Sequence, residues 1–182
     1  MFIHDEKLPI TPGTIAPNPA LFALILPILP HLVGTAASLM CIRHTMPRPD
    51  ARALVACAAT DALNQFELLL WVTNQLARNA SADEMSNACY IRHTAGPAMD
   101  ALNPLCSGDP VTDIHLSIAR AQHARTMCDN ALRLIDDPAT GSALHYVRQR
   151  QIDAASSLGA ILNEIDEPYD YNHAFDVCAL NE

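Results

Sequence analysis

The sequence predicts an all-α protein, built as a bundle of four helices with a long crossover between the second and the third. Four segments place apolar residues three and four positions apart, which is the period of an amphipathic helix. Only six of the 182 residues are glycine, and runs of β-branched residues that would indicate strands are few. Half of the residues are hydrophobic and 17% are charged, which suits one domain over residues 1–182 with a sizeable core.

The first helical segment runs from about Pro19 to His44. Pro27 and Pro30 lie inside it. Proline lacks a backbone N–H and clashes with the preceding turn, so we expect these two residues to divide the segment into a short helix and a longer one. The exact register from Pro27 to Gly34 stays open at this point.

The second helix is predicted to begin after Pro49 and to continue to about Arg78. Asp61 and Gln65 fall on its apolar stripe, where leucine would be the ordinary choice. The predicted inner stripe consists of Leu54, Ala58, Asp61, Gln65, Leu68, Val72 and Leu76.

An irregular region with Gly-Pro, Asn-Pro and Gly-Asp-Pro sequences follows, and it predicts the long crossover. The third helix is expected from about Thr112 to Ile135 and the fourth from about Ala139 to Ile165, before an acidic tail at residues 166–182. The third stripe is Ile114, Ile118, Ala121, Arg125, Cys128, Leu132 and Ile135, and the fourth is Leu144, Val147, Gln151, Ala154, Leu158, Ile161 and Ile165.

The net charge limits the possible binding partners, and the cysteines indicate the cellular compartment. A net charge of −9 and a pI near 5.2 argue against nucleic acid and against an anionic membrane surface as partners. The most apolar stretch is interrupted by Pro27 and Pro30, so no membrane span and no signal peptide are expected. The six cysteines lack zinc-site or CxxC spacing, which favours free thiols in the cytoplasm.

Four helices joined by one long crossover is the plan of ferritin-like bundles, which hold paired metals on inward-facing Glu and Glu-x-x-His residues. Short sequence motifs make this interpretation more specific. From Met1 to about Ile165 the chain resembles the manganese catalases, and in particular their spore-coat relatives. The pieces that carry the resemblance are MFIHDEKL at the start, NPAL at 18–21, IRHTMPRPDARAL at 42–54, LARN at 76–79, RHTAG at 92–96, AQHAR at 121–125, CDNALRLIDDP at 128–138 and LHYVRQRQ at 144–151.

The resemblance implies a hexameric assembly, two manganese ions held by three glutamates and two histidines, and dismutation of hydrogen peroxide. In this sequence, however, the positions of the family's metal ligands are occupied by Leu32, Ala62, Gln65, Ala121, Gln151 and Ala154. No glutamate occurs between Glu6 and Glu67. Manganese needs hard, charged oxygen donors. Leucine and alanine offer no donor atom, and glutamine offers oxygen without charge. We therefore expect the dimanganese site and the catalase activity to be lost, with no cofactor in their place.

The inner stripes bring four polar side chains to a similar level of the bundle: Asp61, Gln65, Arg125 and Gln151. A buried polar group must find a partner. Our hypothesis is that the Gln65 and Gln151 amides bond to each other while Asp61 pairs with Arg125. The alternative is that Asp61 points outward and the glutamines bind water.

Several histidines and cysteines near the bundle are candidate ligands of a different metal, but no pair has a recognisable ligand spacing. They are interpreted as packed or solvated side chains. The residues concerned are His31, His44, His123, Cys41, Cys57 and Cys128.

Two classes of function follow. In the first, the protein is a non-catalytic structural or assembly subunit, as a homo-oligomer or with an active paralogue. In the second, the emptied cavity binds a small molecule or performs a manganese-free reaction, with Asp61, Gln65, Arg125 and Gln151 as its lining. An open cavity of roughly a few hundred Å³ would favour the second class. Residual peroxide dismutation is a further alternative.

Overall fold

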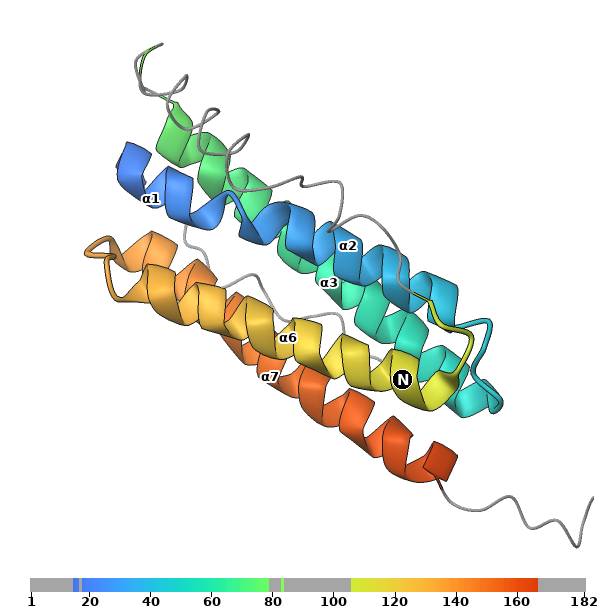
Figure 1. Ribbon diagram of the computed structural model, residues 1–182. Helices are drawn as coiled ribbons and strands as arrows, with labels where there is room; N and C mark the ends of the chain where they lie inside the picture. The colour runs from blue at the N-terminus through green and yellow to red at the C-terminus, as the bar shows by residue number, and fades with distance from the viewer. Residues whose placement is uncertain (1–14, 17, 79–82, 84–105, 167–182) are drawn as a thin grey trace, which may run out of the picture.

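The computed structural model describes residues 15–16, 18–78, 83 and 106–166. Its helices form four long rods, of which the first is made of two helices in succession (Figure 1). The helices are α1 (Pro19–Ile25), α2 (Ile28–Ile42), α3 (Pro49–Ala77), α6 (Pro110–Leu132) and α7 (Pro138–Asp166). The predicted all-α bundle is confirmed.

The predicted break in the first rod is present. The helix α1 ends at Ile25, and α2 begins at Ile28 with Pro27 at its N-cap. Pro30 then falls in the first turn of α2, where backbone N–H groups have no helical partner to lose. Leu32 lies in α2, and its side chain is fully buried.

Short side-chain caps fix the starts of three helices. Asn18 Oδ1 accepts a hydrogen bond from Leu21 N at 3.1 Å, Asp109 Oδ2 from Thr112 N at 2.9 Å, and Asp137 Oδ2 from Thr140 N at 2.8 Å. The cap at Asp109 explains why α6 begins at Pro110 rather than at the predicted Thr112. These caps depend on residues within one turn of each other, so they can be read from sequence.

The rods pack in the cyclic order α2, α3, α7, α6, with α1 extending the α2 rod (Figure 1). Two apolar clusters fill the interior. One gathers around α1, Leu69, Leu76 and Leu144, and the other around Leu39, Val55 and Ile161. Between them lies a layer of small and polar side chains. Buried polar residues at this level are Thr35, Ser38, Gln65, Ser117 and Gln151.

The register predicted for the first half of α3 is wrong by one residue. The structure buries Ala51, Val55 and Ala59, while Leu54 is 36% exposed. The prediction followed the larger side chain. In the bundle, alanine faces the neighbouring helix because a small side chain lets two helices approach closely, and the stripe rejoins the prediction at Gln65 and Leu68.

Two stretches, Pro19–Ile42 and Pro49–Ala77, are long and apolar enough to cross a membrane by length and composition. This qualifies the expectation that no segment could do so. Half of the most apolar window in the first stretch and 33% of that in the second are buried inside the bundle. Core helices of a soluble bundle pass the same test, so the finding does not assign a compartment.

Candidate functional site

Two glutamines meet in the polar layer between the apolar clusters. Gln151 on α7 donates through Nε2 to Gln65 Oε1 on α3 at 2.6 Å, and the two residues are only 3% and 1% exposed. The other polar atom of Gln65, Nε2, donates to Asp61 Oδ2, one turn earlier on α3, at 2.9 Å. The structure thus places the two amides in direct contact across the bundle.

Asp61 is also held from α7, by a forked ion pair with Arg150. The guanidinium donates from Nη2 to Oδ1 at 2.7 Å and from Nε to Oδ1 and Oδ2 at 3.0 and 3.2 Å. The Asp61 side chain is 17% exposed and that of Arg150 is 35% exposed. A two-point contact of this kind is among the stronger polar interactions in proteins. The side chains of four residues are thus connected in sequence by polar contacts, and we call them the central network: Arg150, Asp61, Gln65 and Gln151.

The expected pair between Asp61 and Arg125 is wrong. Arg125 lies on the outer surface of α6 with its side chain 46% exposed, 3.9 Å from the carboxylate of Asp129. The neighbouring Ala124 faces the core instead. A helix turns about 100° per residue, so a shift of one position moves a side chain from the interior to the surface. Burying a guanidinium would also cost its hydration.

Arg150 was missed because it stands beside the predicted stripe rather than on it. A signal was nevertheless present in the sequence, since Arg150 directly precedes Gln151 and Asp61 lies one turn before Gln65. Opposite charges therefore border the two glutamines on two different helices. Recognising the pair required knowing that α3 and α7 are neighbours.

The remaining positions that the resemblance assigns to metal ligands carry no donor atoms. Leu32, Ala62 and Ala121 are buried and Ala154 is partly buried. The two glutamine amides are bonded to each other, and the one carboxylate of the central network faces Arg150. Among the described residues, no three His, Cys, Asp or Glu side chains are grouped closely enough to hold a metal ion. This donor set does not fit a pair of manganese ions.

The histidines and cysteines weighed as other ligands lie apart from the central network. Burial raises the pKa of the Cys128 thiol to about 12, so at neutral pH this side chain is a neutral, packed thiol. Cys41 and His44 are exposed and Cys57 is partly buried. His31 on α2 is partly buried and His123 on α6 is exposed, and their rings are in contact.

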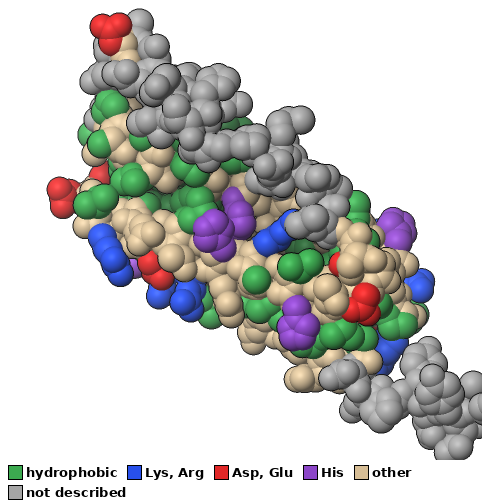
Figure 2. Space-filling model, viewed as in Figure 1, with side chains coloured by type: hydrophobic (Ala, Val, Ile, Leu, Met, Phe, Trp, Pro, Cys, Tyr) green, Lys and Arg blue, Asp and Glu red, His purple; other side chains and the backbone are tan. Residues whose placement is uncertain are grey.

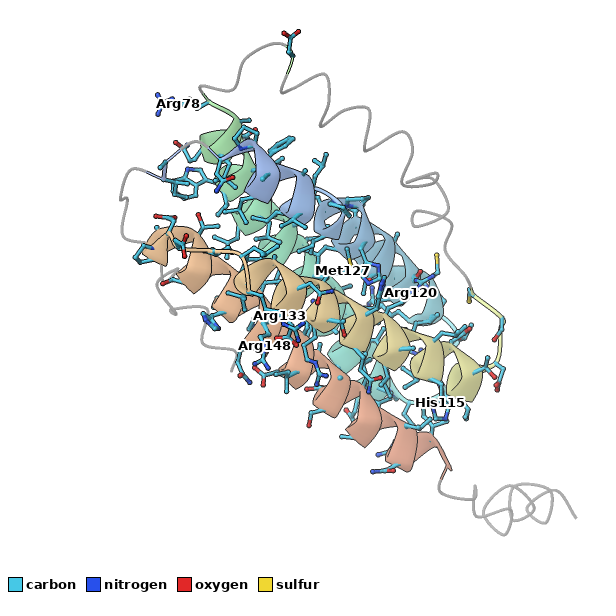
Figure 3. All side chains as sticks on the ribbon, turned by 60° about the vertical axis from the view of Figure 1, so that its left-hand side comes forward. Arg78, His115, Arg120, Met127, Arg133 and Arg148 are labelled. Carbon is cyan, nitrogen blue, oxygen red and sulfur yellow. The ribbon has the colours of Figure 1, made fainter. Side chains whose placement is uncertain are left out.

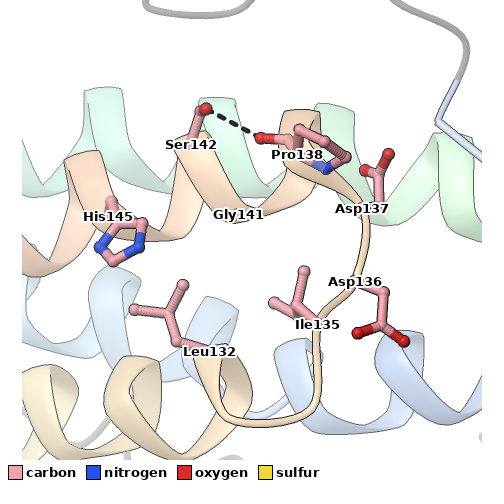
Figure 4. Close-up of a pocket in the computed structure, with 8 residues that line it drawn as sticks. All are labelled: Leu132, Ile135, Asp136, Asp137, Pro138, Gly141, Ser142 and His145. Carbon is pink, nitrogen blue, oxygen red and sulfur yellow. Dashed lines mark hydrogen bonds between the residues drawn. The ribbon is translucent and has the colours of Figure 1, made fainter.

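A pocket of about 230 Å³ lies at the turn between α6 and α7 (Figure 4). Its lining is Leu132, Ile135, Asp136, Asp137, Pro138, Gly141, Ser142 and His145. The Ser142 hydroxyl donates to the Pro138 carbonyl, and Asp137 caps α7. None of the residues of the central network lines this pocket.

The chain was compared with known proteins by sequence and by structure. Protein CotJC of Bacillus subtilis (strain 168) is 23% identical over 166 residues, covering 84% of this chain and 88% of CotJC. The crystal structure of wild-type KatB, a manganese catalase from Anabaena, superposes with a TM-score of 0.73 and 17% identity, over 93% of this chain and 84% of KatB. The chain is thus similar in sequence to CotJC and in fold to a manganese catalase. No protein-family model matches it.

For this manganese-catalase-like chain, the predicted ferritin-like arrangement of four helices is confirmed by the likeness to KatB. The predicted resemblance to the spore-coat relatives agrees with the match to CotJC. At 17% identity the likeness to KatB concerns the fold alone. The chemistry of the centre must therefore be argued from its own residues.

Proposed function

We propose that this manganese-catalase-like chain works without a metal, as a structural subunit rather than as an enzyme. The observation that carries the proposal is the hydrogen bond of 2.6 Å between the Gln151 and Gln65 amides, at two positions that the resemblance assigns to metal ligands. The amide that donates in this bond, Gln151 Nε2, carries no lone pair for a metal. The side chains of Gln65 and Gln151 thus satisfy each other at the level where ions would be held.

Charge supports the same conclusion. Two divalent manganese ions bring four positive charges, which a buried site must offset with carboxylates. Asp61 is the one carboxylate in the central network, and the guanidinium of Arg150 already balances its charge. The site would therefore hold two cations only at a large desolvation cost.

The test is elemental analysis of the purified protein, followed by a peroxide assay after incubation with Mn²⁺. We expect far less than one transition-metal ion per chain and no release of oxygen above that of free Mn²⁺. A manganese catalase loaded in the same way is the positive control. Two bound manganese ions per chain with peroxide dismutation would establish the alternative of residual catalase activity instead.

The subunit is proposed to self-associate. Three large apolar side chains stand in solvent along one side of α3: Leu63 at 45% exposure, Leu70 at 39% and Trp71 at 37%. Positions seven and eight residues apart are about two turns apart and lie on the same side of a helix, so the three form one strip. An exposed apolar strip is typical of a protein interface. We propose a homo-oligomer, such as the hexamer that the resemblance implies, and co-assembly with a paralogue is the alternative.

Replacing Leu70 by glutamate is expected to lower the mass of the particle in solution, since a charge buried at an apolar interface has no partner. Size-exclusion chromatography with light scattering measures the change. Gln122→Glu, which adds the same charge at an exposed position on α6, is the control and should leave the mass unchanged. A monomeric wild-type protein, or an unchanged mass for Leu70→Glu, would contradict self-association through this strip.

The alternative of small-molecule binding in the emptied cavity lacks support from the described pocket, which lies at the turn between α6 and α7. The cysteine pattern supports the cytoplasm as the proposed location. The acidic net charge weighs against nucleic acid and an anionic membrane surface as partners.

A further inference from the structure

A cluster of basic side chains lies where α2 and α6 pack together, apart from the central network. The rings of His31 on α2 and His123 on α6 are 5.0 Å apart and meet edge to face at 79°. Figure 2 shows histidine side chains in contact next to a basic side chain on one face of the molecule. His31 Nε2 lies 2.9 Å from the Arg120 carbonyl oxygen. A carbonyl only accepts, so Nε2 carries the hydrogen and the ring orientation is fixed.

Arg120 differs from the other arginines that reach between helices. Figure 3 shows Arg120 between α6 and α2. Its Nη1 donates to the hydroxyl of Ser38, a residue of α2 that is 2% exposed. Partial burial lowers the pKa of Arg120. Arg148 and Arg150 each meet an aspartate, whereas no carboxylate contacts Arg120 within the part of the chain that the structure describes. A partly buried guanidinium normally has an anionic partner.

Arg120 brings a positive charge to this cluster, although the chain as a whole carries a net charge of −9. The pKa of His31 is lowered, chiefly by burial and further by the positive charges of His123 and Arg120. A guanidinium has five N–H donors, and the bond to Ser38 uses one of them. The others, together with the exposed ring of His123, are suited to the oxygen atoms of an anion.

We propose that the α2–α6 cluster, made of His31, Ser38, Arg120 and His123, binds a small oxyanion of the phosphate class. Arg120 supplies the charge and the N–H donors, and Ser38 holds the guanidinium in place. His123 contributes a ring nitrogen at the exposed edge, and His31 fixes the approach of the two helices. This site is independent of the proposed loss of manganese, since it shares no residue with the central network.

The first experiment titrates the full chain with inorganic phosphate at constant pH and ionic strength, following the ring signals of assigned histidines by NMR. We expect saturable shifts of His31 and His123, with no comparable shift of His115, an exposed histidine on the same helix α6. Non-specific binding of phosphate would shift the ring signals of all three histidines by similar amounts. That result, or the absence of saturation, would overturn the proposal.

The second experiment measures phosphate affinity by calorimetry in matched variants. Arg120→Gln keeps a donor for Ser38 but removes the charge, and it should weaken binding about tenfold or more. Arg133→Gln removes an exposed arginine at the C-cap of α6 and should change the affinity by less than about twofold. Equal weakening by both variants would show a non-specific charge effect and refute the site. If Arg120→Gln does not fold, His123→Gln, at an exposed position, should weaken binding about threefold, and an unchanged affinity would refute the site.

Discussion

Replacing Arg150 by alanine is expected to lower the free energy of unfolding by about 2 kcal/mol. The substitution removes all three N–H contacts that the guanidinium makes with Asp61. The Asp61 side chain is 17% exposed, so water can replace these contacts only in part. The partial exposure of Arg150 keeps the expected loss below that of a fully buried pair.

The matched control is Arg125→Ala, the residue that the sequence had paired with Asp61. Its side chain is 46% exposed, and Asp129 keeps a second partner in Arg148, so the loss should stay below about 0.5 kcal/mol. Chemical denaturation followed by far-UV circular dichroism measures both variants. Protein concentration must be held constant, because self-association contributes to the stability of an oligomer. A larger loss for Arg125→Ala than for Arg150→Ala would reverse the assignment of the pair.

Replacing Gln151 alone by leucine is expected to destabilise the protein by about 1–3 kcal/mol. Gln65 Oε1 would lose its donor in a layer where Gln65 is 1% exposed, and water has little access to replace it. Gln65→Leu should cost a similar amount, because it removes the acceptor of Gln151 Nε2 and also a donor to Asp61.

Replacing both glutamines by leucine should cost little or should stabilise the protein. Both partners of the buried hydrogen bond then disappear together, and the new side chains join the apolar clusters on either side. A double-mutant cycle on the free energy of unfolding gives the coupling between the two positions. A double variant that loses the sum of the two single losses would show that the bond of 2.6 Å does not couple α3 to α7 in solution.

The sequence by itself determined the helices and much of what lies at the centre of the bundle. The break at Pro27 and the start of α3 at Pro49 depend on interactions within one or two turns, which are encoded locally. Gln65 and Gln151 could be placed inward because each continues an apolar stripe along a single helix. Ala121 likewise continues its apolar stripe, whereas Leu32 and Ala62 were assigned as metal-ligand positions by the resemblance.

Only the tertiary structure decided which side chains meet across helices. Asp61 pairs with Arg150 rather than Arg125 because α7, and not α6, is the neighbour of α3 on that side. The contact of His31 with His123 likewise requires α2 beside α6. Such pairings depend on the order of the rods and on the rotation of each helix about its axis to within one residue, and no pattern within a single helix contains that information.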